Sequence, residues 1–143
     1  MNPTNNNIWE EEKMYSDNNR KAVYGESYIY EKLISEGIDV EWLAINNRQS
    51  LADFKTSEGK TIDAKIAYVN KLRAWQFNFH HHNKKQIGID FYICLLIRDN
   101  EPIIFIFPSS IIRGKSLSIT RSSLDRGKYG YFKNNWSLLV NSS

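Results

Sequence analysis

Residues 52–66, ADFKTSEGKTIDAKI, decide how the chain folds, because two alternating segments flank a turn signal there. Residues 52–56 and 61–69 place apolar and polar side chains alternately, which is the period of a half-buried strand. The Ser-Glu-Gly-Lys stretch between them, residues 57–60, is typical of a turn. The pattern predicts a β-hairpin, in which residues two apart on each strand share one face of the sheet.

Three charged residues of this hairpin are candidates for a shared site. Asp63 and Lys65 are two apart on the second strand and project from one face, while the apolar residues beside them point into packing. Asp53 lies on the first strand, and antiparallel pairing can bring its carboxylate near that of Asp63. Two carboxylates this close repel each other unless a cation lies between them, and oxygen ligands on a rigid sheet suit Mg²⁺. The alternative for Asp63 and Lys65 is a common surface salt bridge.

A helix is expected before the hairpin, over residues 16–36. Ser16 or Asp17 can cap its start, and Gly37 stands where a helix stop is expected. Its apolar stripe comprises Ala22, Val23, Ile29, Tyr30, Leu33 and Ile34. Glu26 falls on this stripe, where a carboxylate is costly unless it is paired, protonated or bound to a metal. The alternative is a Glu26 at the edge of the stripe that reaches solvent.

The remaining pattern predicts an α+β (α/β) chain, with a mixed central sheet of about five or six strands flanked by helices. Further strands are expected at residues 40–45, 74–79, 91–97 and 103–107. The stretch 91–97 is a continuous apolar run, typical of a strand buried on both faces. Residues 108–110 are expected to open a short helix that ends at Gly114, and the last 25 residues show no clean period.

The composition fits one ordinary domain, since the chain has 143 residues, 41% of them apolar and 24% charged. The longest apolar run is about seven residues, against the ~20 needed to span a bilayer, and no secretory leader opens the chain, so a cytoplasmic protein is expected. The single cysteine, Cys94, excludes an internal disulfide framework and a cysteine-based zinc site. We expect a single domain over residues 1–143, with an N-terminal arm at 1–16 and a basic, aromatic C-terminal segment at 114–143.

Charge is distributed unevenly along the chain. Residues 1–63 carry 7 Lys and Arg against 12 Asp and Glu, whereas residues 64–143 carry 12 against 4. The net charge of +3 therefore combines −5 and +8. A basic half with interleaved aromatic residues is one signature of a nucleic-acid binder, although ordinary solvated Lys and Arg give the same count.

The order Glu26, Asp53 and then Ile62-Asp63-Ala64-Lys65 resembles the motif of the PD-(D/E)XK nuclease superfamily. The segments KLRAWQFNF, GIDFY, IFPSS and NNW, within residues 71–136, are similar to small group I intron-encoded (homing) endonucleases of that superfamily. The resemblance covers roughly residues 20–140. The chain departs from the motif at Ala52, where the superfamily commonly has Pro.

This resemblance implies a restriction-endonuclease-like core and the Mg²⁺-dependent hydrolysis of phosphodiester bonds in double-stranded DNA, with Mn²⁺ able to substitute. Asp53 and Asp63 would hold the metal together with the Ala64 backbone carbonyl, and Glu26 would hold a second metal ion or a water molecule of the first. Lys65 would orient or deprotonate the attacking water. One site cuts one strand, so a homodimer or homotetramer is expected. A restriction enzyme, a Holliday-junction nuclease and a non-catalytic DNA-binding module on the same fold are the alternatives.

Basic residues in two segments are candidates for DNA contacts. The first segment contributes Lys71, Arg73, His80, His82, Lys84 and Lys85. The second contributes Arg113, Lys115, Arg121, Arg126 and Lys128. The alternative for both is a solvated loop, and the histidines lack an acidic neighbour that would complete a metal site. Four side chains are expected in the core: Cys94, Trp75, Phe77 and Phe79. Four further aromatic residues are expected in the core or in a subunit contact, with base stacking as the alternative: Tyr129, Tyr131, Phe132 and Trp136.

Overall fold

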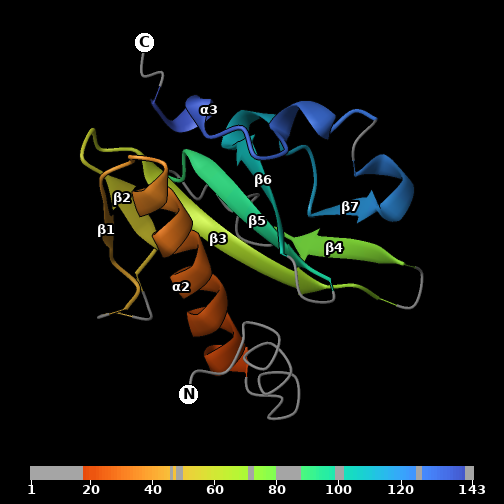
Figure 1. Cartoon of the computed structure of the whole chain (residues 1–143), viewed down its shortest axis with the longest axis horizontal. Helices are drawn as coiled ribbons and strands as arrows, with labels where there is room; N and C mark the ends of the chain where they lie inside the picture. The colour runs from red at the N-terminus through yellow and green to blue at the C-terminus, as the bar shows by residue number, and fades with distance from the viewer. Residues whose placement is uncertain are drawn as a thin grey trace.

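The structure, a computed structural model, describes residues 18–45, 47, 50–70, 73–79, 88–98, 102–124 and 127–140 of the chain. The elements run in the order α2 (Asn18–Ser35), β1 (Val40–Trp42), β2 (Phe54–Thr56), β3 (Thr61–Tyr68), β4 (Ala74–Asn78), β5 (Phe91–Ile97), β6 (Ile103–Pro108), η2 (Ser109–Ile111), β7 (Ser116–Thr120), η3 (Arg121–Ser123), η4 (Gly130–Phe132) and α3 (Ser137–Val140). Figure 1 shows α2 crossing the sheet on the left of the view and the β4–β7 pair on the right.

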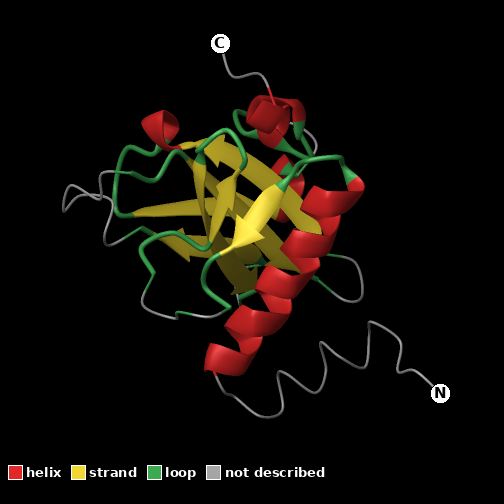
Figure 2. Ribbon diagram, turned by 90° about the vertical axis from the view of Figure 1, so that its left-hand side faces the viewer, coloured by secondary structure: helices red, strands yellow, loops and turns green. Residues whose placement is uncertain are grey.

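The central sheet has five strands in the order β1-β2-β3-β5-β6, and β4 pairs with β7 in a separate two-stranded ribbon. The β1–β2, β2–β3 and β5–β6 pairs are antiparallel, whereas β3 and β5 are parallel, so the sheet is mixed. Figure 2 shows α2 lying along one face of the strands. The expected α+β architecture with a mixed central sheet is confirmed, and so is the hairpin formed by β2 and β3.

Two apolar cores lie on opposite faces of this sheet. On the α2 side, Ile29 and Leu33 are fully buried against Ile62 of β3 and Ile93 of β5. The other face of β5 packs against apolar side chains of the ribbon, with Trp75 fully buried. Because β5 contributes side chains to both cores, its sequence is a continuous apolar run, and its bounds match the expected residues 91–97.

Gly37 ends α2 as expected. Its backbone has a φ of +79°, a left-handed conformation that glycine adopts without a steric penalty. The Gly37 N–H donates to the Ile34 carbonyl at 3.0 Å, and the Ile38 N–H donates to the Leu33 carbonyl at 2.9 Å. These two bonds form a Schellman motif, and Ile38 joins the same core as Leu33. The expected caps at residues 16 and 17 lie outside the described residues.

Parts of the expected helix stripe are wrong. Val23 and Ile34 are 41% and 45% exposed, so neither faces the sheet. Gly25, which has no side chain, faces β3 instead, and a Cβ atom built there would lie only 2.3 Å from Ile66 Cγ1. The face of α2 that packs on the sheet therefore includes Gly25, where the helix closely approaches β3, and leaves out the larger side chains of Val23 and Ile34.

The strand predictions differ from the structure at several ends. The expected strand at 40–45 stops at Trp42, and the first hairpin strand begins at Phe54 rather than at residue 52. The strand β7 was not expected, because the last residues of the chain show no long alternating pattern. The short helix expected after residue 108 is the single 3-10 turn η2, which ends at Ile111.

Candidate active site

The strands β2 and β3 separate at Asp53, and this separation creates the site. Phe54 is the last residue of β2 to pair with β3, opposite Ile62. The Asp53 N–H still donates to the Ile62 carbonyl at 2.9 Å, but β2 does not continue beyond it. The next backbone N–H of β3 on this edge, that of Ala64, donates instead to Asp53 Oδ2 at 2.7 Å. The side chain of Asp53 thus replaces the missing strand as the hydrogen-bond partner of β3.

Asp63 and Lys65 form an ion pair on β3, with 3.2 Å between Lys65 Nζ and Asp63 Oδ2. The two side chains are only 27% (Lys65) and 19% (Asp63) exposed, so the pair lies in a partly closed site rather than on an open surface. Lys65 Nζ also lies 5.9 Å from the centre of the Phe79 ring. In the β3–β5 register Asp63 is beside Tyr92 and Lys65 is beside Cys94, which places both on the ribbon-facing side of β3.

Glu26 is buried in α2 with 3% of its surface exposed, so the alternative that it reaches solvent is wrong. The indole Nε1 of Trp42 donates to Glu26 Oε1 at 3.0 Å. The Trp42 ring in turn stacks on Tyr30, with 5.3 Å between ring centres. This packing fixes the indole donor and, through it, the carboxylate. Trp42 is a contributor that the sequence pattern did not indicate, because only the register of β1 against β2 brings it beside α2.

The pKa values of the two aspartates reflect the crowding of negative charge. Burial, followed by the charges of Asp63 and Glu26, raises the pKa of Asp53 to about 8, although the Ala64 N–H bond partly offsets this rise. Burial also raises the pKa of Asp63, and the charge of Lys65 is the largest opposing effect. Glu26 raises the pKa of both aspartates. A cation placed among these carboxylates would relieve their mutual repulsion.

The donor set fits a hard divalent cation of the size of Mg²⁺. Asp53 and Asp63 supply carboxylate oxygens, and the Ala64 carbonyl points to the same edge of β3 as the N–H that Asp53 accepts. Among the described residues, no three His, Cys, Asp or Glu side chains lie close enough together to hold a metal ion. Water and substrate oxygens would therefore complete the coordination, which is how Mg²⁺ is commonly bound in proteins.

Two other ionisable residues beside the site are buried and belong to the core. Cys94 is fully buried, and burial raises the pKa of its thiol far above the ordinary value, so it is inert core as expected. Burial, and secondly the charge of Asp63, raise the pKa of Tyr92 to about 12. Trp75, Phe77 and Phe79 are buried as expected.

Most of the aromatic residues near the C-terminus pack as expected. Tyr129 and Phe132 contact the Phe107 ring edge-on, with 5.5 and 5.3 Å between ring centres. Trp136 is partly buried against the core on the α2 side. Tyr131 is 69% exposed, so it does not lie in the core, and a subunit contact, the other expectation for it, stays a prediction.

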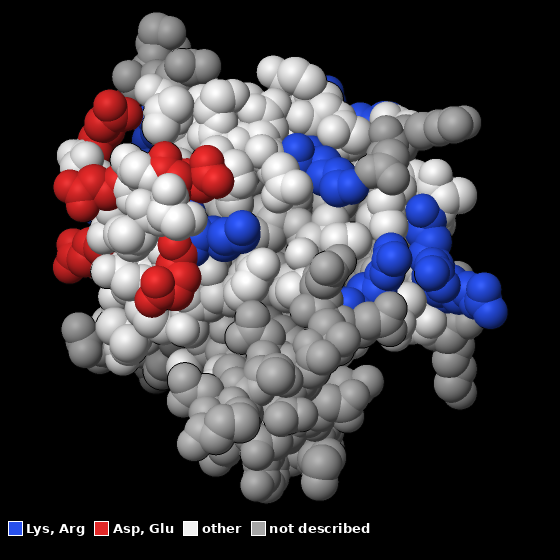
Figure 3. All heavy atoms as spheres, viewed as in Figure 1, with Lys and Arg blue, Asp and Glu red and all other residues white. Residues whose placement is uncertain are grey.

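Five of the expected DNA-binding residues are described, and all five are exposed: Arg73, Arg113, Lys115, Arg121 and Lys128. Figure 3 shows the face of the molecule that is turned to the viewer in Figure 1. Lys and Arg gather on its right, over β4 and β7, whereas Asp and Glu gather on its left, over β1 and β2. The remaining candidates lie outside the described residues: Lys71, His80, His82, Lys84, Lys85 and Arg126.

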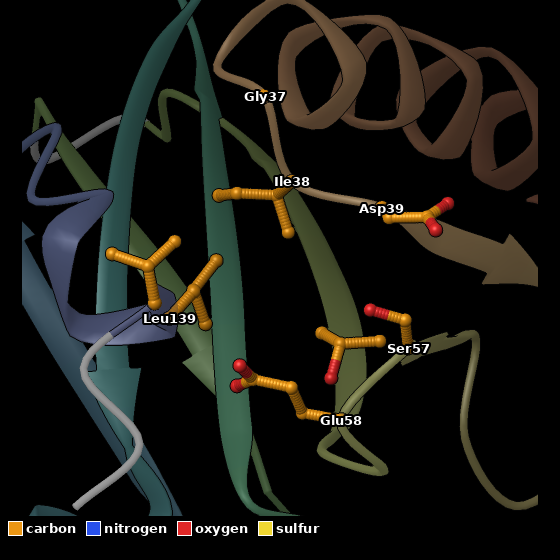
Figure 4. A pocket seen from close by; sticks show the side chains of 8 residues that line it. Gly37, Ile38, Asp39, Ser57, Glu58 and Leu139 are labelled. Carbon is orange, nitrogen blue, oxygen red and sulfur yellow. The ribbon is translucent and has the colours of Figure 1, made fainter.

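A separate pocket of about 130 Å³ lies away from these residues, between the end of α2, the β2–β3 turn and α3 (Figure 4). Its lining residues are Gly37, Ile38, Asp39, Thr56, Ser57, Glu58, Leu139 and Val140. It contains none of the candidate catalytic residues, so its volume has no bearing on the carboxylate site.

Comparison with known proteins shows a likeness to a solved structure. No protein-family model and no curated protein matches the sequence. The solved structure of a bacterial homing endonuclease, I-Ssp6803I, is similar to this one with a TM-score of 0.68 at 14% sequence identity, over 87% of this chain and 91% of that chain. At this identity the likeness establishes the fold, a mixed sheet flanked by helices. No helix among the described residues is both long and apolar enough to cross a lipid bilayer.

Proposed function

We propose that this chain is a Mg²⁺-dependent endonuclease of the PD-(D/E)XK type, which hydrolyses phosphodiester bonds in double-stranded DNA. One observation carries the proposal: Asp53, Asp63 and Lys65 meet where β2 and β3 separate, and the charge of the buried Glu26 acts on both aspartates. Crowded, half-buried carboxylates destabilise a fold unless they serve a cation, so the arrangement is typical of a functional site. The likeness to a bacterial homing endonuclease supports the same class of reaction.

The metal would be held by the carboxylates of Asp53 and Asp63 and by the Ala64 carbonyl. When bound, it supplies positive charge against the phosphate and lowers the pKa of the attacking water. Mn²⁺ is expected to substitute, because carboxylate and carbonyl oxygens suit both ions.

The chain's own residues then orient the reaction. Lys65, 3.2 Å from Asp63 Oδ2, donates hydrogen bonds that orient the attacking water and places positive charge near the phosphate as negative charge develops there. Glu26, fixed by the Trp42 indole, accepts a hydrogen bond from a water molecule of the site and adds negative charge that strengthens metal binding. One such site cuts one strand, so cleavage of a duplex requires two copies, and we include a homodimer or homotetramer in the proposal.

Plasmid cleavage tests this function. Supercoiled plasmid is incubated with the protein in Mg²⁺, in Mn²⁺ and in EDTA, and we expect nicked and linear products only with a metal. Lys65→Ala is expected to lower the rate by about 10²–10⁴-fold while DNA binding persists. The matched control is Lys55→Ala, since Lys55 is an exposed lysine on the neighbouring strand β2. A Lys65→Ala protein that cuts at the wild-type rate would show that the site is assigned wrongly.

The same assay separates the other proposals on this fold. A homing or restriction endonuclease cuts a linear duplex at defined positions, and a junction-resolving nuclease prefers a four-way junction offered beside it. A non-catalytic DNA-binding module binds DNA in a salt-dependent manner but leaves the plasmid intact in both Mg²⁺ and Mn²⁺.

A further inference from the structure

The side chains on one face of the β4–β7 ribbon are uncharged hydrogen-bonding groups except at Ala74, the buried first residue of β4. Gln76 is opposite Ser118, and Asn78 is opposite Ser116. All four are exposed, while the alternate positions of both strands are buried in the core. A solvated sheet surface commonly carries Lys and Glu, which also prevent edge pairing. A face of amides and hydroxyls is instead suited to donating and accepting specific hydrogen bonds.

Cations stand at both ends of this polar face. Arg73 precedes β4 and Arg121 follows β7, and the antiparallel register of the ribbon brings these two to the same end. Lys115 precedes β7 at the other end. All three side chains are exposed, and Figure 3 shows the accumulation of basic residues over β4 and β7. The ribbon thus has an uncharged centre with positive charge at both ends, which complements an anionic backbone that flanks polar base edges.

Arg73 occupies a conformation that favours glycine. Its φ is +59°, in the left-handed region that a residue with a Cβ atom adopts at a steric cost. The turn is fixed by Asn70, whose carbonyl accepts from the Arg73 N–H at 3.0 Å and whose side chain accepts from the Ala74 N–H at 3.1 Å. A strained backbone at an exposed arginine is the kind of departure that is often found at functional sites, so the guanidinium is a candidate for a contact with the ligand.

The ribbon adjoins the candidate active site through Phe79. Phe79 directly follows Asn78, and its N–H donates to the Lys115 carbonyl at 2.7 Å. Its ring centre lies 5.9 Å from Lys65 Nζ. A duplex whose scissile phosphate lies at Lys65 therefore presents its neighbouring base pairs to this end of the ribbon.

We propose that the β4–β7 ribbon enters the major groove and reads base edges next to the cut, with Gln76 and Asn78 as the specificity-determining residues. The major groove, about 12 Å wide, admits a two-stranded β-ribbon. Amide side chains pair bidentately with adenine, so the ribbon selects adenine at two nearby positions. Arg73, Arg121 and Lys115 contact the phosphates on either side. The inference rests on the proposed function for its substrate, double-stranded DNA.

A binding selection tests this inference separately from catalysis. The Lys65→Ala protein is mixed with a randomised 24-bp duplex library in Mg²⁺, and the bound fraction is sequenced. We expect an enriched motif with adenine at two nearby positions. Gln76→Ala is expected to reduce the preference at one of these positions about tenfold, and Asn78→Ala to do so at the other. Each should leave the salt dependence of binding unchanged.

A variant at Arg73 and a control variant distinguish phosphate contacts from base contacts. Arg73→Gly relieves the strained φ, so the fold is kept, while affinity for every sequence falls and the slope of log K against log salt is reduced by about 1. The matched control is Glu41→Ala with Lys55→Ala, an exposed cross-strand pair on the acidic side of the molecule, which should change neither motif nor slope.

The outcomes separate the two proposals. The inference is overturned if the ribbon variants enrich the same motif with the same preference, or if the starting protein enriches no motif. If the motif depends on the ribbon but the wild-type protein does not nick plasmid in Mg²⁺, the ribbon inference stands and the proposed catalysis fails.

Discussion

Replacing Gly25 of α2 by alanine tests how the buried glutamate is positioned. A Cβ atom at residue 25 would lie 2.3 Å from Ile66 Cγ1 and 2.8 Å from Ile66 Cδ1 on β3. Carbon atoms in contact are normally about 3.5–4.0 Å apart, so either α2 must move away from β3 or the Ile66 side chain must leave its rotamer. Glu26 follows Gly25 directly and would move with the helix.

Two effects of opposite sign determine the result of Gly25→Ala. Alanine is favoured over glycine inside a helix by about 1 kcal/mol. Inserting a methyl group into a packed contact costs about 1–3 kcal/mol, and here the displaced neighbour is a branched side chain packed against the core on the α2 side. We expect the steric effect to win, with a net loss of about 1–2 kcal/mol in the free energy of unfolding. The rate of plasmid cleavage should also fall, because a displacement of about 1 Å in a catalytic group can lower a rate about 10²-fold.

Urea unfolding and plasmid cleavage measure these two losses. Gly114→Ala is the control, because a Cβ atom there meets nothing within 4 Å. Ile66→Ala removes the two clashing atoms and leaves Ile66 Cβ at an ordinary 3.5 Å. In that background Gly25→Ala should become neutral or stabilising, which is a positive coupling in a double-mutant cycle. A Gly25→Ala protein more stable than the wild type would refute the close-contact argument.

Three further predictions follow from the site. Trp42→Phe removes the indole donor from Glu26 and should lower the free energy of unfolding by about 1–3 kcal/mol, more than Trp136→Phe does in the same core, as measured in urea. In EDTA, thermal stability should fall as pH rises from about 4 to about 8. The raised pKa of Asp53 makes the folded state bind more protons than the unfolded state in that pH range. Asp53→Asn should remove most of this pH dependence. At pH 8, Mg²⁺ should raise the thermal midpoint of the wild type but not that of Asp53→Asn/Asp63→Asn.

The strands on which the site depends could be predicted from local sequence. The hairpin is encoded by alternation on both sides of a Ser-Glu-Gly-Lys turn, and this alternation alone is enough to assign Asp63 and Lys65 to one face of one strand. The strand β5 was predicted to the residue because both of its faces are buried and its sequence is uniformly apolar.

The elements that sequence did not reveal depend on contacts between distant segments. The strand β7 has only five residues, SLSIT, and its alternation is too short to stand out among neighbouring Ser, Arg and Lys. Its partner β4 begins 42 residues before it, so the ribbon exists only through a long-range pairing. The contact of Trp42 with Glu26 is likewise set by the register of β1 on β2, which the sequence does not specify.

Several positions that break local rules lie in the candidate site or beside the ribbon. Gly25 weakens the middle of a helix, and Glu26 is a carboxylate in its buried stripe. Asp53 brings a second acid to Asp63 where the hairpin opens, and Arg73 holds a positive φ beside the ribbon. Sequences specify a fold when local preferences agree with it, and departures concentrate where function requires them. Gly25, Glu26 and Asp53 lie on the helix and the strand edge that form the candidate site, and Arg73 lies at one end of the surface proposed to meet DNA, so these departures from local preference coincide with the parts of the molecule to which a function is assigned.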